Sequence, residues 1–224
     1  EDLPVTEPIL APSSALASVV VPGHYGAPGG DGVTLSECRG MALFSVAARA
    51  GKAAELVEDG DSVYIDIGTT TLLFAQKLKQ KNNISVITNS LAVAAELGNH
   101  PGAKVILCGG ELRGGELSLS GPIAMQSFQN IYVDKAFVGI GGLSIESGFT
   151  DYHIGEAELR KMMLSHAKMR IALMDHSKTY VTAFYKTASV QDLDVVITDS
   201  KTDAAIVKYL TDNGLEVLVV GNEP

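Results

Sequence analysis

The sequence predicts an α/β fold in which helices flank a mostly parallel sheet. Short apolar runs alternate with helical stretches along most of the chain. Most of these runs are unbroken, as in VVIT at 195–198 and VLVV at 217–220, rather than alternating between polar and apolar residues. Unbroken runs indicate strands that are buried on both faces, as in a parallel sheet. The regular alternation of strands and helices favours the α/β class with right-handed crossovers.

The predicted elements follow one another in a regular order. The strands cover 62–67, 84–88, 104–108, 135–140, 170–174, 194–198 and 216–220. The helices between them cover 47–57, 70–81, 91–97, 122–130, 155–167 and 202–212. On the fifth helix, Leu159, Met162 and Met163 recur at helical spacing. We interpret this stripe as core packing rather than as a methionine-based site.

Length and composition limit the possible classes of protein. The chain has 224 residues, 46% of them hydrophobic, and a formal net charge of −9. This length suits one large domain, or one domain with an appendage. The hydrophobic share supplies a sizeable core and excludes wholesale disorder. The negative charge argues against a bare nucleic-acid binder, which needs a basic face, but it permits a small basic pocket for an anionic ligand.

The cysteines and apolar runs indicate where the protein resides. Cys38 and Cys108 are too few for a disulfide framework and too far apart for a paired metal motif. We therefore expect a cytoplasmic protein without a metal or other cofactor. No run approaches the roughly 20 apolar residues that span a bilayer. The run at 15–21 lacks the basic flank of a signal peptide, so we expect neither a signal peptide nor a membrane partner.

The first part of the chain differs from the rest. Residues 1–45 contain most of the prolines, several glycines and a single arginine, Arg39. This composition predicts an irregular arm or linker, in which a short helix starts near Met41. We place the regular, ligand-binding domain at 46–224.

The first predicted strand is followed by a candidate phosphate loop. Ligands of open α/β sheets bind outside the carboxyl ends of the strands. Here that end reads Asp66, Ile67, Gly68, and then Thr69, Thr70 and Thr71, which open a helix. Glycine permits close approach, and a helix N-terminus offers free N–H groups to a phosphate. The alternative is a threonine N-cap with glycine in the turn.

Small and polar residues follow the other strands as well. They are Thr88, Asn89 and Ser90, then Gly109 and Gly110, then Gly139, Gly141 and Gly142, and finally Asp175 and Lys178. Each group alone is explained by turn or capping chemistry. Their convergence at one edge of the sheet favours a binding site. In this last pair Lys178 supplies a cation for a phosphate. Alternatively, Asp175 and Lys178 form a surface ion pair.

A further pair of charged residues lies on the fifth helix. Glu156 and Arg160 are four residues apart, hence on one helix face and in the order that favours pairing. One interpretation is a pocket carboxylate for sugar hydroxyls and a guanidinium for phosphate. The other is a solvated pair on the helix surface.

The order of these motifs resembles the C-terminal sensor domain of DeoR-type transcriptional repressors. The matching segments are DIGTTT (66–71), VITNSLAVAAEL (86–97), VILCGGELR (105–113), SLSGPIA (118–124), KAFVGIGGL (135–143), GFTD (148–151), EAELRKMM (156–163), MDHSKT (174–179), Phe184 and DLDVVITD (192–199). They cover roughly residues 47–220. The resemblance implies Rossmann-like layers of the kind found in ribose-5-phosphate isomerase, glucosamine-6-phosphate isomerase and coenzyme A transferase.

The resemblance also implies a function and a site. In that family the domain binds a phosphorylated sugar or a related phosphometabolite and thereby changes the DNA affinity of a regulator of sugar-metabolism genes. The implied pocket residues are Asp66, Gly68, Thr69, Thr70, Thr71, Thr88, Asn89, Ser90, Gly109, Gly110, Gly141, Glu156, Arg160, Asp175 and Lys178. The family often has lysine where this chain has Arg160. It also implies a dimer or tetramer.

DNA binding and catalysis need separate consideration. DeoR proteins carry a winged helix-turn-helix, and residues 1–45 show no such pattern, so we expect DNA contact only through a helix-turn-helix that is not among these 224 residues. An alternative function is a sugar-phosphate isomerase of the same fold, with Asp66, Glu156 or His153 as the base. A nucleotide-binding α/β domain is a third possibility, but the chain lacks its glycine fingerprint.

Overall fold

A computed structural model describes residues 35–221, with side chains from Phe44 onward. The first helix, α1, spans Leu35–Glu55. It starts earlier than the predicted helices near Met41 and at 47–57, because residues 35–45 are helical as well. The remainder of the predicted arm, 1–34, lies outside the described residues, so the division of the chain at 45/46 stays a prediction. None of the helices in the described part of the chain has the length and apolarity needed to cross a bilayer.

The centre of the fold is a seven-stranded sheet in which every neighbouring pair is parallel. Its strands are β1 (Ser62–Ile65), β2 (Ile84–Thr88), β3 (Ala103–Leu107), β6 (Val133–Gly139), β9 (Ala167–Leu173), β11 (Val195–Asp199) and β12 (Glu216–Val220). These are the seven strands predicted from the apolar runs, with ends shifted by at most a few residues. The predicted α/β class is therefore confirmed.

The strand order contains one reversal. From one edge to the other the sheet reads β12-β11-β9-β6-β1-β2-β3. The chain first builds outward from β1 to β3, then returns to place β6 on the other side of β1 and continues to β12. Such a switch in direction opens a crevice at the carboxyl ends of the two central strands. Here those strands are β1 and β6, so the crevice lies beside Asp66 and Gly139.

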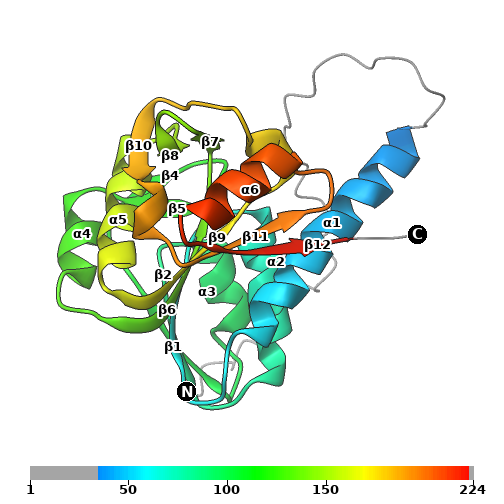
Figure 1. The fold of residues 1–224 in the computed structure, drawn as a ribbon. Coiled ribbons are helices and arrows are strands. Elements are labelled where there is room, and N and C mark those ends of the chain that lie inside the picture. Colours follow the sequence, from blue (N-terminus) through cyan, green and yellow to red (C-terminus); the bar gives the residue numbers. More distant parts are fainter. Residues whose placement is uncertain (1–34, 222–224) are drawn as a thin grey trace, which may run out of the picture. The chain divides into compact units, whose positions relative to one another are not determined.

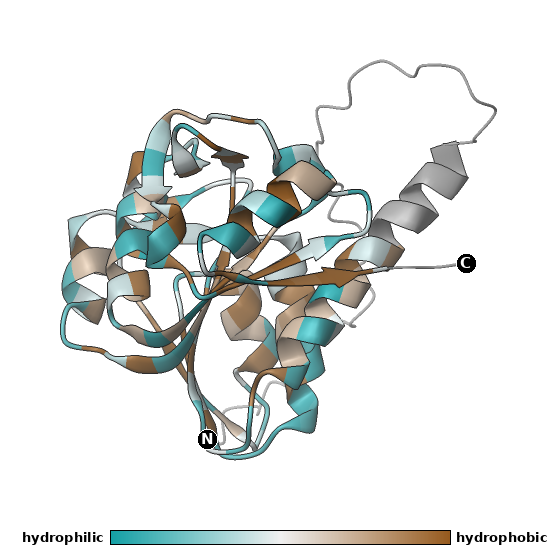
Figure 2. Cartoon of the chain, in the orientation of Figure 1, coloured by the Kyte–Doolittle hydropathy of each residue, from teal (hydrophilic) through white to brown (hydrophobic). Residues whose placement is uncertain are grey.

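Helices cover both faces of the sheet (Figure 1). Helices α1, α2 (Thr69–Lys77) and α3 (Leu91–Leu97) pack on one face, and α4 (Pro122–Phe128), α5 (Ile154–Ser165) and α6 (Ala204–Asp212) on the other. Alternate residues of β1 point to the two helix layers. Val63 and Ile65 belong to the hydrophobic cluster beneath α1, α2 and α3, and Tyr64 belongs to the cluster beneath α4, α5 and α6. Figure 2 shows the strands as largely hydrophobic and the outer helix faces as hydrophilic, as a three-layer fold requires.

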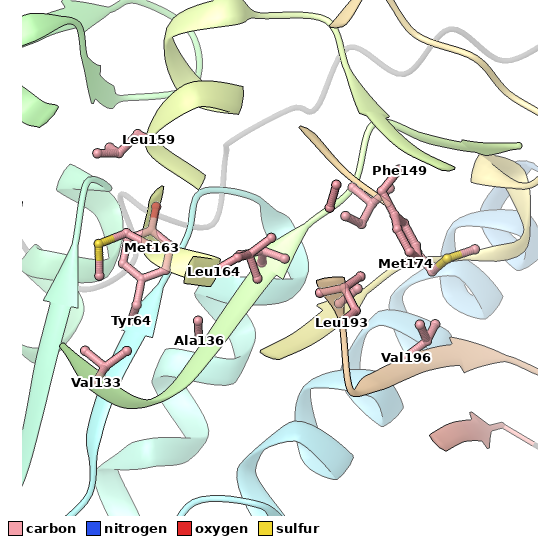
Figure 3. Close-up of a cluster of buried hydrophobic side chains, with 14 of the residues drawn as sticks. Tyr64, Val133, Ala136, Phe149, Leu159, Met163, Leu164, Met174, Leu193 and Val196 are labelled. Atoms are coloured by element: carbon pink, nitrogen blue, oxygen red, sulfur yellow. The ribbon is translucent and has the colours of Figure 1, made fainter. Parts of the chain in front are cut away.

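The core beneath α5 tests the methionine stripe. Leu159 and Met163 are fully buried, and Met162 packs against the same cluster. Figure 3 shows Leu159, Met163 and Leu164 gathered with Tyr64 above the sheet. The core-packing interpretation of the stripe is confirmed.

Two small antiparallel sheets were not predicted. Strands β4 (Glu111–Arg113) and β5 (Ser118–Ser120) form one, and β7 (Gly142–Ser144), β8 (Gly148–Asp151) and β10 (Tyr185–Ala188) form the other. They follow β3, β6 and β9 along the chain, and each strand has only three or four residues. Such short runs carry too little periodicity to be recognised.

Candidate functional site

The centre of the candidate site is a buried group of three charges. Asp66 follows β1 and has no exposed surface. Its Oδ2 accepts a hydrogen bond from Arg160 Nε at 2.6 Å and another from the Gly139 backbone N–H at 3.1 Å. Arg160, on α5, also donates from Nη1 to Asp151 Oδ2 at 2.6 Å. Arg160 therefore ties the central crevice to the small sheet that ends at Asp151.

Burial and pairing act in opposite directions on these groups. Burial raises the pKa of the Asp66 carboxyl above its ordinary value, while the Arg160 guanidinium opposes that shift. Burial lowers the pKa of Arg160, but Asp66 and Asp151 raise it more, so the net pKa lies above the ordinary value. Arg160 stays charged, and two of its three guanidinium nitrogens, Nε and Nη1, already bind carboxylates. The positive charge that it presents to a phosphate is therefore offset by Asp66 and Asp151.

Glu156 and Arg160 do not pair with each other. Glu156 is 3% exposed and accepts two hydrogen bonds from Arg113, Nε to Oε1 at 2.7 Å and Nη2 to Oε2 at 3.1 Å. The Ser118 hydroxyl donates to the same carboxylate. The solvated-pair interpretation is wrong because both side chains turn inward to different partners. Glu156 binds residues on β4 and β5, whereas Arg160 binds Asp66, just after β1, and Asp151, the last residue of β8.

Arg113 is a site residue absent from the predicted set. It lies three residues after Gly110, on β4, and its side chain is 31% exposed. Two of its three guanidinium nitrogens bind Glu156, so the carboxylate fixes the orientation of a half-exposed cation near the strand ends. An arginine just after a glycine pair at a strand end is the signal that identifies it.

The polar residues at the end of β2 make their hydrogen bonds within the protein. Asn89 accepts from the Tyr64 hydroxyl at 3.0 Å and donates to the Leu119 carbonyl at 3.2 Å. Thr88 donates to the Ile65 carbonyl at 2.6 Å. Ser90 caps α3 by accepting from the Val93 N–H at 3.2 Å, so the capping alternative is confirmed for this residue. All three side chains are buried and act as supports beneath the site.

The N-terminus of α2 is open. Gly68 occupies the N-cap position with φ 132°, and no side chain of the described residues caps the helix. Thr71 instead donates to the Gly68 carbonyl at 2.9 Å, so the threonine N-cap alternative is wrong. Thr69 is exposed and Thr70 is half-buried. Uncapped N–H groups and the positive end of the helix dipole attract an anion.

The predicted glycines after β3 and β6 serve close packing. A Cβ on Gly110, which has φ 138°, would lie 2.6 Å from the Ser120 carbonyl oxygen. A Cβ on Gly141 would lie 3.0 Å from the Thr150 carbonyl oxygen. These positions bring the small sheets against the strand ends. Gly109 is exposed, and its N–H donates to Ser127 Oγ at 3.3 Å.

Asp175 and Lys178 do not form the surface ion pair considered as an alternative. Asp175 caps the short 3-10 helix η3 (His176–Lys178) by accepting from the Ser177 N–H at 2.9 Å. Lys178 is half-buried and makes no ion pair with any residue between 44 and 221. It is therefore an uncommitted cation at the end of β9.

Comparison with known proteins decides the family. Residues 47–200 match the family model described as the DeoR C terminal sensor domain. The chain belongs to the DeoR sensor domain family. The family resemblance that was based on the order of the sequence motifs is confirmed.

Curated relatives of this DeoR sensor domain are transcriptional regulators. The HTH-type transcriptional regulator GolR of Listeria innocua is 33% identical over 172 residues, which cover 77% of this chain and 68% of GolR. The repressor GlcR of Bacillus subtilis is 37% identical over 167 residues, covering 75% and 64% of the two chains. The glycerol-3-phosphate regulon repressor of Escherichia coli is 27% identical over 168 residues, covering 75% and 67%. The chain thus spans about two thirds of the length of these relatives, which are regulators rather than enzymes.

A solved structure supports the fold. The eIF2B beta subunit of Chaetomium thermophilum superposes with a TM-score of 0.51 at 17% identity, covering 80% of this chain and 56% of its own. Ribose 5-phosphate isomerase A of Methanocaldococcus jannaschii gives a TM-score of 0.46 at 17% identity, covering 61% and 54%. At such identity the likeness concerns architecture alone.

The DeoR sensor domain carries a second buried charge cluster that the sequence did not reveal. Arg49 on α1 is 2% exposed and donates from Nη1 to Asp199 Oδ2 at 3.1 Å. Its Nη2 lies 3.9 Å from Asp175 Oδ2. Asp199, at the end of β11, also accepts from the backbone N–H of His176 at 3.2 Å and faces its ring Nδ1 at 3.0 Å. An arginine in an alanine-rich helix gives no signal of this role.

A hollow lies at the opposite edge of the sheet. Its volume is about 380 Å³, and its lining includes Ser62, Asp134, His166 and Lys168, at the amino ends of the strands. None of the predicted site residues lines it. The hollow and the predicted site residues therefore lie at opposite edges of the sheet. We take the carboxyl edge as the candidate site, because the buried charges and the uncapped N-terminus of α2 converge there. Within the described residues no group of three His, Cys, Asp or Glu side chains is arranged to hold a metal.

Proposed function

We propose that this domain binds a phosphorylated sugar at the carboxyl edge of the central sheet. The observation that carries the proposal is the uncapped N-terminus of α2, which follows β1 at the crevice between β1 and β6. A phosphate there accepts hydrogen bonds from the backbone N–H groups of Thr69 and Thr70 and from the Thr70 hydroxyl. Lys178, two strands away in the sheet, supplies a cation that no carboxylate of the described residues neutralises.

In this proposal most of the predicted residues fall into two groups. Gly68, Thr69, Thr70 and Lys178 contact the ligand. The buried residues position them, and each of these side chains already makes at least one hydrogen bond within the protein. This second group consists of Asp66, Thr71, Thr88, Asn89, Ser90, Glu156 and Arg160. Such pre-organisation lowers the entropic cost of binding.

The regulator to which the domain belongs would respond to the ligand through its DNA affinity. Ligand binding shifts a conformational equilibrium only by as much as its affinities for the two states differ. A helix-turn-helix of the kind for which HTH-type relatives such as GolR are named would make the DNA contact. A dimer or tetramer and a cytoplasmic location stay predictions.

A thermal-unfolding screen tests the binding proposal. The panel is glycerol 3-phosphate, glucose 6-phosphate, fructose 6-phosphate and ribose 5-phosphate, each beside its unphosphorylated parent. A ligand at a hundred times its Kd stabilises the fold by about 2.7 kcal/mol. For a chain of this size that corresponds to a rise in Tm of roughly 5–10 °C. If neither these compounds nor a wider panel of phosphorylated sugars raises Tm, the proposal is wrong.

A further inference from the structure

The Arg49 cluster joins two elements that are far apart in the chain. Arg49 lies on α1, which is the first helix of the described unit, and His176 lies on η3, which carries Lys178. Both bind the same carboxylate: Asp199 Oδ2 accepts from Arg49 Nη1 at 3.1 Å and from the His176 N–H at 3.2 Å. Asp199 is 4% exposed, so little solvent screens these contacts. A displacement of η3 therefore changes the surroundings of Asp199, the residue to which Arg49 of α1 is hydrogen-bonded.

The cluster is also incompletely satisfied. Arg49 Nε is buried and has no hydrogen-bond partner. Its Nη2 lies 3.9 Å from Asp175 Oδ2, too far for a hydrogen bond. A buried guanidinium with an unmade hydrogen bond carries a desolvation cost. A small movement of η3 toward α1 would bring Asp175 within hydrogen-bond reach of Arg49 Nη2.

We propose that Arg49 is a positioning residue that couples η3, and with it Lys178, to helix α1. The ligand part of this inference rests on the proposed function, since a phosphate held by Lys178 would move or fix η3. Through Asp199 and Asp175 that change reaches Arg49 and so α1. The charge cluster thus links the strand-end site to the helix that leads toward the preceding part of the chain.

Hydrogen exchange without any ligand tests the coupling first. The measured segments are 44–57 in α1 and 174–181 around η3, with 91–97 in α3 as reference. We expect Arg49→Met to accelerate exchange in 174–181 at least about fivefold, and Asp175→Asn to accelerate exchange in 44–57, because coupling between two elements is reciprocal. Asparagine retains the acceptor that caps η3, so Asp175→Asn removes the charge and keeps the turn.

Two further variants separate coupling from general damage. Arg170→Met is the matched control, because Arg170, in the middle of β9, pairs through Nη2 at 2.8 Å with Asp194, just before β11 and away from η3. It should leave 44–57 and 174–181 unchanged. Arg49→Lys retains the charge and should show a smaller effect of the same pattern if the Met variant does not fold. Unchanged exchange in 174–181, or equal acceleration in 91–97, would overturn the proposal.

A second arm uses a ligand and distinguishes the two proposals. The probe is the sugar phosphate that gives the largest Tm shift in the panel. It should slow exchange in 44–57 of the wild type and lose that effect in Arg49→Met. Binding without an effect on 44–57 would overturn the coupling and leave the binding proposal intact. If no probe binds, the binding proposal fails, and the ligand-free arm still decides the coupling.

Discussion

The two edges of the central sheet carry similar ion pairs in different surroundings. At the carboxyl edge, Arg160 and Asp66 are 2.6 Å apart, and their side chains are 3% and 0% exposed. At the amino edge, Lys168 and Asp134 are 2.8 Å apart, and their side chains are 82% and 34% exposed. The distances are nearly equal, so solvation decides what each pair does. The buried pair constrains the architecture of the site, while the exposed pair is a surface feature.

The largest expected effect comes from removing the buried guanidinium. Arg160→Met leaves Asp66 and Asp151 without their cation, and we expect the free energy of unfolding to fall by about 3–5 kcal/mol. Urea denaturation measures this loss. The matched change at the amino edge, Arg170→Met, should cost less than about 1 kcal/mol because its partner Asp194 is solvated. Equal losses from the two variants would contradict the contrast between the edges.

The next effect concerns affinity rather than stability. Lys178→Ala removes the uncommitted cation, and charge-assisted hydrogen bonds are worth about 1.5–3 kcal/mol. We expect the Kd for a phosphorylated sugar from the panel to rise by roughly ten- to a hundredfold, with unfolding free energy unchanged. Isothermal titration with the sugar phosphate and its unphosphorylated parent separates the contributions. A similar loss for both would place the phosphate elsewhere.

Thr70→Ala should have a smaller effect of the same kind. It removes one hydroxyl donor and leaves the backbone N–H groups of α2 in place, so we expect a loss of about 1 kcal/mol in the binding free energy. Thr71→Ala is the matched comparison, because the Thr71 hydroxyl is engaged with the Gly68 carbonyl. Titration of the sugar phosphate into both variants measures the difference. A larger loss of affinity in Thr71→Ala would mean that the contact residues are wrongly assigned.

The smallest effects concern pH, and they have opposite signs at the two edges. Hydrogen bonds from Lys168 and Ser62 lower the pKa of Asp134, so its stabilisation is present above the unfolded pKa of about 3.9 and disappears as pH falls through the folded value. Burial raises the pKa of Asp66, so its contribution to stability declines as pH rises through the folded value. Urea unfolding of the wild type, Asp134→Asn and Asp66→Asn between pH 2 and 7 checks this. The stability difference from wild type should grow with pH for Asp134→Asn and shrink with pH for Asp66→Asn.

Strands and strand ends were predictable because they depend on local composition. An apolar run such as VVIT is buried on both faces wherever it lies in a parallel sheet, and the residue that follows it reaches the edge. The partners of those residues were not predictable. Spacing placed Glu156 and Arg160 on one helix face, but their partners, Arg113 and Asp151, come from short strands without a recognisable period. The sequence therefore predicted which residues lie at the carboxyl edge of the sheet, and only the fold showed which of their charges are already neutralised.

Arg49 shows most clearly that the partner of a charged side chain could not be predicted from the sequence. Its helix is rich in alanine, and its acceptor, Asp199, is 150 residues further along the chain. Complementary charge at that separation becomes visible only when α1 lies beside β11. The same holds for Lys178, whose value as a site residue depends on having no carboxylate partner among the described residues.

The reversal of strand order between β1 and β6 has a consequence for how the chain folds. Strands β1 to β3 pair with near neighbours in sequence, whereas the contact that joins β1 to β6, from Ser62 to Asp134, spans 72 residues. Closing so long a loop is slow relative to local pairing. We therefore expect two halves, 62–107 and 133–220, to gain structure early and the seam between them to close late. The proposed ligand site lies on this seam. A bound sugar phosphate would therefore regulate the protein and also slow its unfolding.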